Sequence, residues 1–457
     1  MRLSKAQVGR RVHTDLDLRF ESQRLTSFAG LFVFGGLFER LHLRSRLRAR
    51  FDERGKKGYG LYQLLLLLVI HVLMGCRSWR ERDSYAHDPM VMRVLGVQRI
   101  PDVSTLSRRL GEATAAQEEG VRELVGDIAL DRLLKLEVRR ATLDFDGSVN
   151  STRRHAEGTA VGYNKRKKGA RSYYPLFCTI SQTGQFLNCL HRPGNVHDSE
   201  GALDFMRDCV LRARLTVGCV VEARVDSAFF AQPLLDQLDE LDVEFTASVP
   251  FERLLLLKGI VEKTKRWLRI DDEWSYAETN YRPKSWKFSP RFVLYRRLLP
   301  KQRKGPIQLD LFEPRDYQYE YKVVVTNKSV SAGAVLEFHN GRGYQECVLG
   351  EAKQGAALEH VPSNRLIPNQ LSMDAAMLAH NLGRELQFET SDIVTRTTPN
   401  RTPATRLQTL AQLTRRIVRR AGVLTRPQGK LTLTISAGDE DTREEFRNYA
   451  RELARAA

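Results

Sequence analysis

The segment VRRATLDFD, residues 138–146, alternates between apolar and polar side chains from position 141 onward. Apolar side chains stand at positions 141, 143 and 145, and Asp144 and Asp146 are among the polar residues between them. Because successive side chains of a β-strand point to opposite faces, this alternation predicts a strand with one buried face. The strand ends in carboxylates, which makes its end a candidate for chemistry.

Strand and helix patterns alternate after this first strand. The turn Gln182-Thr183-Gly184 lies between two strand-like stretches and favours a hairpin. The order β-β-β-α-β-α-β predicts the α/β fold class, with helices around one sheet. Strands are expected at 138–146, 173–181, 185–192, 219–226 and 243–249, and helices at 199–213 and 228–238.

The composition is strongly basic, with 73 Lys and Arg against 55 Asp and Glu and a formal net charge of +18. Such a charge attracts polyanions, and nucleic acid is the first candidate because binding releases condensed counterions. A basic protein that binds no polyanion is the alternative. The six cysteines are scattered without a CxxC pair, which favours neither a zinc site nor a disulfide framework.

The start of the chain lacks the apolar core of a signal peptide. The apolar run at 64–74 is shorter than the roughly 20 residues that a membrane span needs, so we expect a buried helix there. These two patterns predict an intracellular chain without a membrane partner.

The pattern of the chain differs on the two sides of the predicted core. Up to residue 135 it is helical throughout. Residues 250–319 hold clustered basic residues, three of the four tryptophans and strand-like stretches, which predicts an inserted β-rich subdomain. We therefore expect a helical N-terminal domain for DNA binding or dimerisation at 1–135, the two parts of the core at 136–249 and 320–395, the β-rich insertion at 250–319 and a basic C-terminal region at 396–457.

Three carboxylates far apart in the sequence fit the cleavage of a phosphodiester. That reaction develops charge on both the attacking and the leaving oxygen, and two divalent ions stabilise both charges. Mg²⁺ prefers carboxylate oxygens as ligands. Asp146 and Asp226 each end a predicted strand, so they meet if these strands are neighbours. Either residue alone is explained equally well as a cap of the following turn.

The third carboxylate is Glu346, expected in a helix over about 337–354. His339, Arg342, Glu346 and Lys353 follow one another at steps of three, four and seven residues. At 3.6 residues per turn these steps keep the four side chains within roughly a 60° arc of one helix face. A carboxylate between two cations can bind a metal while the cations bind phosphate oxygens. The alternative is a surface helix with salt bridges.

At this point the sequence resembles the DDE transposases of bacterial insertion sequences, in the group 1 type with a β-rich insertion and a Y-(2)-R-(3)-E-(6)-K signature. Arg342, Glu346 and Lys353 occupy the Arg, Glu and Lys positions. His339 stands where the family usually has Tyr, and His can also donate to phosphate.

Shorter motifs extend the resemblance over about residues 100–425. LDFDGS at 143–148 resembles the strand with the family's first Asp, and VDSAFF at 225–230 resembles the segment with the second. RPGN at 192–195 and LAHNL at 378–382 are further likenesses.

The resemblance implies an RNase H-like catalytic core with the β-rich insertion between the second Asp and the Glu. It also implies an enzyme that uses Mg²⁺ or Mn²⁺, as two ions held by Asp146, Asp226 and Glu346. As a homodimer it would bind the terminal inverted repeats of an insertion sequence, cut the DNA and transfer the strands to a target. The expected location is the cytoplasm, at the bacterial nucleoid. A hydrolytic nuclease on the same fold and a non-catalytic DNA-binding descendant are the alternatives.

Asp144 and Asp146 share one strand face, so either could reach a metal ion. We prefer Asp146 because it ends the strand next to Gly147-Ser148, as the resemblance requires, with Asp144 as an acceptor that supports it. Trp267, Trp274 and Trp286 are candidates for stacking on a flipped base, and burial in the insertion's own core is the commoner fate of a tryptophan. The expected DNA contacts are His339, Arg342, Lys353, the basic loop residues Lys165, Arg166, Lys167, Lys168 and Arg171, the insertion residue Trp286, and the C-terminal residues Arg415, Arg416, Arg419 and Arg420.

Overall fold

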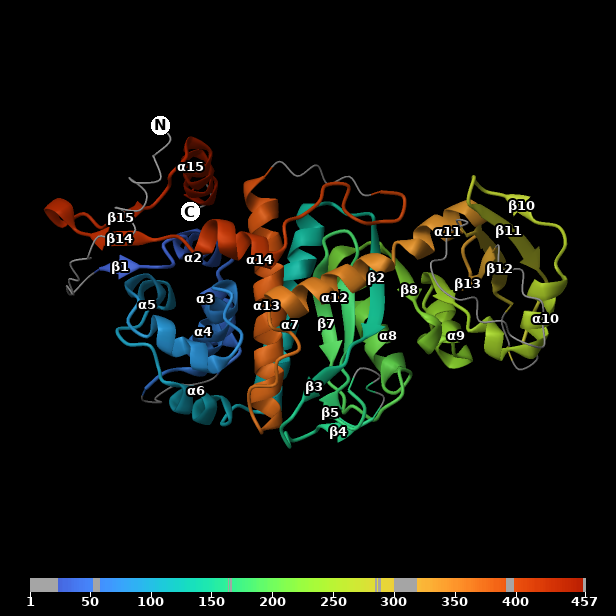
Figure 1. Cartoon of the computed structure of the whole chain (residues 1–457), viewed down its shortest axis with the longest axis horizontal. Helices are drawn as coiled ribbons and strands as arrows, with labels where there is room; N and C mark the ends of the chain where they lie inside the picture. Colours follow the sequence, from blue (N-terminus) through green and yellow to red (C-terminus); the bar gives the residue numbers. More distant parts are fainter. Residues whose placement is uncertain are drawn as a thin grey trace, which may run out of the picture.

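A nine-stranded mixed sheet runs through the middle and the right-hand part of the molecule (Figure 1). The computed structural model describes residues 24–51, 58–162, 164, 167–283, 286, 289–299, 319–391 and 398–454. The strand order is β10-β11-β12-β13-β9-β8-β2-β6-β7, so the fold is mixed α/β. Among the helices of these described ranges, none is both long and apolar enough to cross a membrane.

Strand β2 (Arg140–Gly147) is the strand that the alternation of residues 138–146 predicts. It pairs in parallel with β8 (Val220–Val225) and antiparallel with β6 (Leu176–Ile180). Its apolar residues are buried, as expected, but Thr142 and Asp144 on the other face are buried as well. The sheet therefore has helices on both faces, and the polar side chains of β2 need partners inside the protein.

The remaining predicted strands of the core also form. β6 and β7 (Gln185–Leu190) make the expected hairpin, and Gly184 in its turn has a φ of +63°, which favours glycine. β9 (Glu244–Ser248) pairs in parallel with β8. The helices α8 (Ala202–Val217) and α9 (Gln232–Glu240) share one hydrophobic core with β2 and β8.

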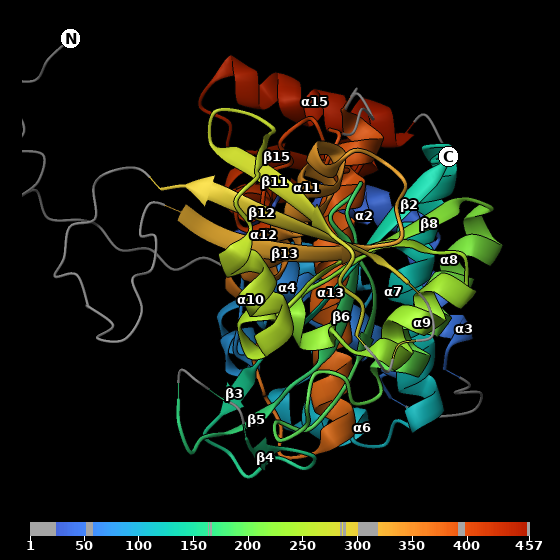
Figure 2. The same cartoon turned by 90° about the vertical axis from the view of Figure 1, so that its right-hand side faces the viewer.

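The strands of the predicted insertion continue the central sheet. From β9 outward, each strand pairs antiparallel with the next. A separate subdomain would have a sheet of its own. Here β13 pairs with β9 along one edge and with β12 along the other, so the insertion strands lengthen the central sheet. Helix α10 (Leu255–Lys263) precedes them and lies beside the sheet in Figure 2. The strands are β10 (Leu268–Arg269), β11 (Trp274–Thr279), β12 (Arg291–Leu298) and β13 (Tyr319–Thr326).

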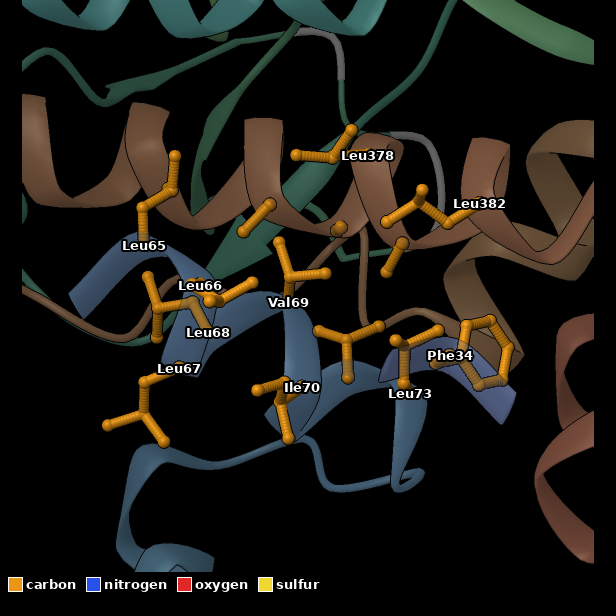
Figure 3. Close-up of a cluster of buried hydrophobic side chains, with 14 of the residues drawn as sticks. Phe34, Leu65, Leu66, Leu67, Leu68, Val69, Ile70, Leu73, Leu378 and Leu382 are labelled. Carbon is orange, nitrogen blue, oxygen red and sulfur yellow. The ribbon is translucent and has the colours of Figure 1, made fainter. Parts of the chain in front are cut away.

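The N-terminal helices pack around α4 (Leu61–Leu73), the helix expected from the apolar run. Its side chains meet Leu378 and Leu382 of α13 (Leu366–Thr390), and Phe34 lies at one end of the cluster (Figure 3). The helix α13 thus joins the N-terminal helices to the sheet. The other helices of this part are α2 (Leu31–Arg40), α3 (Leu43–Ala49), α5 (Pro89–Leu95), α6 (Val103–Leu110) and α7 (Ala115–Lys135).

The C-terminal segment shares the core of the N-terminal helices. Strand β1 (Leu25–Thr26) pairs with β14, so the first 135 residues are not purely helical as expected. Ile417 and Leu453 belong to the same buried cluster as α4. The two ends of the chain therefore form one packed unit. Its C-terminal elements are α14 (Leu410–Leu413), η4 (Thr414–Val418), β14 (Gly422–Thr425), β15 (Thr432–Ile435) and α15 (Glu440–Ala454).

Candidate active site and basic cleft

Asp146 and Asp226 lie at the carboxyl ends of neighbouring parallel strands. Asp146 is in the last part of β2, and Asp226 follows β8 and accepts a hydrogen bond from the Ala228 backbone N–H at 2.9 Å. Burial raises the pKa of Asp146 to about 7, and the charges of Asp226 and Glu346 add to the effect while Arg342 opposes it. Burial also raises the pKa of Asp226. The pairing of β2 with β8 thus brings the two carboxylates together.

Arg342 joins Asp146 to Glu346. Its Nη2 lies 2.9 Å from Oε1 of Glu346, and its Nη1 lies 3.7 Å from Oδ2 of Asp146. The Nη1 atom is buried and makes no hydrogen bond within the described part of the chain. The guanidinium is therefore placed to bind an anion that enters between the two carboxylates.

The helix expected at 337–354 is two helices, α11 (Ala332–Asn340) and α12 (Gly343–Gly355). His339 lies on α11 and is buried, with its ring nitrogens 2.8 Å from Ser248 Oγ and 3.0 Å from Thr246 Oγ1. Burial lowers its pKa well below the usual value, so the ring is neutral. Both ring nitrogens of His339 thus have partners inside the protein, and its contact with phosphate stays a prediction.

Arg224 explains why the helix breaks. Its Nη1 donates to the carbonyl of Phe338 at 2.9 Å and to that of Asn400 at 2.7 Å. The Arg342 N–H then bonds to the carbonyl of His339 at 3.1 Å, which tightens the turn.

Asp144 forms a buried ion pair with Arg224. Arg224 Nε lies 2.5 Å from Oδ1 of Asp144, and its Nη2 lies 2.7 Å from Oδ2. The two residues are opposite one another in the register of β2 and β8. Because both oxygens of Asp144 already accept from Arg224, Asp144 is less free than Asp146 to bind a ligand.

A carboxylate that the sequence reasoning missed lies beside Gly147. A Cβ atom on Gly147 would lie 2.6 Å from Oη of Tyr174 and 3.1 Å from Oδ1 of Asp198. The Tyr174 hydroxyl donates to Asp198, and the Asp198 charge contributes to the raised pKa of Asp226. The available signal was its position three residues after the RPGN motif at 192–195.

A cleft of about 1200 Å³ opens onto these residues, with Gly147 and Asp198 in its lining. Ser151 and Thr152 of β3 (Asn150–Thr152) also line the cleft. β3 forms a small sheet with β5 (Arg171–Tyr173) and β4 (Ala160–Val161), which is visible in Figure 2. The positive charges outnumber the negative ones, which suits a polyanion. The cations of the lining are Arg77, Arg153, Arg154, Lys167, Arg253 and Lys353.

The predicted basic loop lies only partly in the cleft. Lys167 lines it, and Lys168 is exposed beside Lys167. Arg171 is half-buried and donates to Thr159 Oγ1 at 2.9 Å. Lys165 and Arg166 lie outside the described residues.

Trp286 is buried and packs on the rings of Phe230 and Phe292, at centroid distances of 5.2 and 6.0 Å. Burial is the alternative fate given for this tryptophan in the sequence analysis, and its stacking on a base stays a prediction. Trp267 and Trp274 are covered in part by the guanidinium groups of neighbouring arginines, 4.9 and 5.7 Å from the ring centroids.

None of the four predicted C-terminal arginines lines the cleft. Arg416 pairs with Glu445, and Arg419 donates to the Met74 carbonyl at 2.8 Å. Arg420 donates to the Arg416 carbonyl at 2.8 Å. Arg415 is exposed and donates to the Ala411 carbonyl of α14. Arg416 and Arg419 therefore attach the C-terminal segment to the rest of the protein.

The carboxylates suit a hard divalent cation. Their donors are oxygens, and the raised pKa of Asp146 shows that burial and repulsion disfavour its charge without a nearby cation. Within the described residues, no three His, Cys, Asp or Glu side chains are close enough together to hold a metal ion, and Arg342 lies between Asp146 and Glu346.

Comparisons with known proteins give matches among transposases. The piggyBac transposase synaptic complex with hairpin DNA has 12% identity and a TM-score of 0.43, and the match covers 85% of this chain and 79% of that chain. The Mos1 transposase paired-end complex with the left transposon end has 15% identity and a TM-score of 0.18 and covers 43% and 61%. No curated protein matches. The sequence model of the family described as Transposase DDE domain group 1 matches residues 9–457, and this chain therefore belongs to that family.

Proposed function

We propose that the chain is a DNA transposase of the insertion-sequence type, which binds terminal inverted repeats, cuts the DNA and transfers the strands to a target. The observation that carries this proposal is the position of Asp146 and Asp226 at the ends of the neighbouring parallel strands β2 and β8, with Arg342 between Asp146 and Glu346, beside a basic cleft. Family membership supports it. The spacing of Arg342, Glu346 and Lys353 supports the Y-R-E-K type within the family, with His339 as a departure.

The strands β7-β6-β2-β8-β9 would form an RNase H-like catalytic core. Their order and directions support this, because one antiparallel hairpin precedes two parallel crossovers through α8 and α9. Domains are proposed at 1–135, 136–249, 250–319, 320–395 and 396–457, and the outer strands of the sheet form the β-rich insertion. A homodimer is the proposed form in the DNA complex.

Asp146, Asp226 and Glu346 would hold two Mg²⁺ or Mn²⁺ ions, which stabilise charge on the attacking and leaving oxygens when bound. We propose that, when DNA binds, the Arg342 guanidinium gives up its contacts with Asp146 and Glu346 and contacts a phosphate oxygen instead. Its buried Nη1, which makes no hydrogen bond within the described residues, supports this role. Lys353 and Lys167, which line the cleft, would contact neighbouring phosphates.

The experiment replaces Asp226→Asn and, separately, Glu346→Gln, and measures cleavage of duplex DNA from the ends of the element. Each variant should bind DNA like the parent. Its rate of cleavage should fall by about a hundredfold or more, because several kcal/mol of charge stabilisation are lost. Asp204→Asn is the control, since the Asp204 side chain is exposed on α8 and pairs with Arg207 at 3.0 Å. Undiminished cleavage by either active-site variant contradicts the proposal.

The products separate strand transfer from hydrolysis. A transposase joins the cut ends to target DNA, so joined molecules should appear on a gel when a target plasmid is added. A hydrolytic nuclease on the same fold would yield cut ends only.

A further inference from the structure

The carboxylate of Glu346 lies on the first turn of α12 and is positioned by that turn. The side chain is 60% exposed, and it contacts Arg342 of the same turn at 2.9 Å. Arg342 stands at the N-cap of α12, and its side chain makes no capping hydrogen bond within the described residues. The place of Glu346 therefore depends on how the first turn of α12 is attached to the sheet.

Gln345, the residue before Glu346, attaches this turn to two strands. Its Nε2 donates to the carbonyl of Asp144 on β2 at 2.8 Å and to the carbonyl of Phe177 on β6 at 3.4 Å. Phe177 is opposite Asp146 in the register of the two strands. One amide thus joins the helix of Glu346 to the strand of Asp146.

Gln345 occupies a position of α12 at which an apolar side chain is expected. Val348, Leu349 and Ala352 follow it at steps of three, four and seven residues and are buried in the hydrophobic core. Gln345 is on the same face and is completely buried. Its Oε1 makes no hydrogen bond in the part of the chain that the structure describes.

Stability alone does not account for a glutamine at this position. A buried polar atom without a partner destabilises a protein, and an apolar side chain of similar size would not carry this cost. The amide adds direction, because a hydrogen bond to a strand carbonyl restricts both the height and the rotation of the helix over the sheet. Contacts between apolar groups are not directional in this way.

Resting on the function proposed above, we infer that Gln345 is a positioning residue for Glu346 and Arg342. Its amide fixes the first turn of α12 over β2 and β6, so that Arg342 reaches Asp146 and holds Glu346 beside it. Because Gln345 is buried, it does not contact the DNA itself. A displacement of reacting groups by about 1 Å can lower a rate about a hundredfold. Gln345 therefore acts on the rate of DNA cleavage and leaves DNA binding unchanged.

The experiment compares Gln345→Met with the parent. Methionine has nearly the same length and volume but cannot donate, so this change removes the hydrogen bonds and keeps the packing. Cleavage of duplex DNA from the ends of the element is measured with Mg²⁺ at increasing protein concentration, which separates the rate at saturation from the concentration at half-saturation. Gln345→Met should lower the saturated rate about tenfold or more, change the half-saturating concentration less than about twofold and keep the melting temperature.

Gln182→Met is the matched control. Gln182 is a buried glutamine at the other end of β2, where its Nε2 donates to the Arg140 carbonyl at 3.0 Å and its Oε1 accepts from the Thr142 N–H at 3.1 Å. Because both ends of its amide have partners, Gln182→Met should lower the melting temperature but keep the saturated rate of cleavage. Gln345→Leu removes the same amide as Gln345→Met with a differently shaped side chain, and it should give the same loss of rate.

An unchanged saturated rate for either folded variant of Gln345 overturns the inference. A rate that falls as much for Gln182→Met as for Gln345→Met also overturns it, because cleavage would then follow stability. The same holds if only the half-saturating concentration rises, since Gln345 would then act on DNA binding. If neither variant of Gln345 folds, the amide serves stability and the inference fails as well.

Glu346→Gln in the same assay separates this inference from the proposed function. If Glu346→Gln loses cleavage and Gln345→Met does not, the inference about Gln345 fails and the active site stands. If Glu346→Gln cleaves like the parent, the proposed function itself fails.

Discussion

Gly147 is the residue on which the geometry of the site depends most directly. It stands between Asp146 and the pair formed by Tyr174 and Asp198, with no room for a side chain. The resemblance accounts for a small residue after the first Asp. The structure adds the physical reason, which is the approach of a tyrosine hydroxyl and a carboxylate to the backbone.

Gly147→Ala should therefore lower metal-dependent DNA cleavage by about tenfold or more, because Tyr174 and Asp198 must move away, and the overpacking should cost about 1–3 kcal/mol of unfolding free energy. Gly350→Ala on α12 is the control, since no atom lies within 4 Å of the added Cβ. That change should leave cleavage unaltered and stabilise the helix by about 0.5–1 kcal/mol. Equal cleavage by both variants in a gel assay would show that the close approach is unimportant.

The spacing of residues in the sequence predicts some side-chain contacts of the site but not others. Arg342 and Glu346 do contact one another, as their spacing of four predicts. His339 belongs to the same spacing pattern, yet it is buried against β9. Trp286 could be recognised as a large aromatic residue, but its burial depends on Phe230 and Phe292, which lie on other elements.

At the scale of elements, the pattern of apolar residues predicted β2 and α4 well. The break between α11 and α12 was not predictable from it, although Gly341 lies at the break. A Cβ on Gly341 would lie 2.0 Å from Arg224 Nη1 and 2.3 Å from the Asn400 carbonyl. The break thus depends on a side chain from β8 and a carbonyl from residue 400, both far away in sequence.

The contact of α13 with the β6–β7 hairpin gives a prediction about pH. His380 Nε2 lies 2.9 Å from the Gly184 carbonyl, and burial lowers the pKa of His380 to about 4. The unfolded chain, with a His pKa of about 6.5, binds more protons between these values, so stability is lost as pH falls from about 6.5 to 4.

His380→Gln should flatten that dependence, because glutamine can donate to the same carbonyl but does not titrate. The measurement is the free energy of unfolding by urea at pH 7, 6 and 5 for both proteins. An unchanged slope between pH 7 and 5 would contradict the role given to this histidine. Other buried histidines, such as His71 with a pKa lowered to about 4, should leave part of the slope in the variant.

At the scale of the whole molecule, part of the positive charge lines one cleft, where we propose that it acts on DNA. The cleft takes cations from separate parts of the chain, from Arg77 to Lys353. Of the C-terminal arginines, Arg416 and Arg419 make contacts within the protein. The net charge alone could not distinguish the cations that line the cleft from those that make contacts within the protein.

Replacing Arg153→Ala and Arg253→Ala together should weaken DNA binding to a similar degree for all sequences. Both arginines line the cleft, and the removal of each cation that binds a phosphate should reduce the slope of log Kd against log salt by about one. Fluorescence anisotropy at several KCl concentrations measures this slope. Arg207→Ala on α8, outside the cleft, is the control and should keep it. If the double variant also keeps the slope, the DNA does not follow this cleft.

The sequence by itself determined what depends on neighbouring residues. The alternation at 141–146 produced a strand, and the spacing of Arg342 and Glu346 produced their contact, because local periodicity decides which side chains share a face. Only the tertiary structure decided that Asp198 approaches Gly147, next to Asp146, and that Asp144 pairs with Arg224. These contacts link β2, β8 and the loop before α8. They depend on packing between segments that are far apart in the sequence, and such packing leaves no pattern among neighbouring residues.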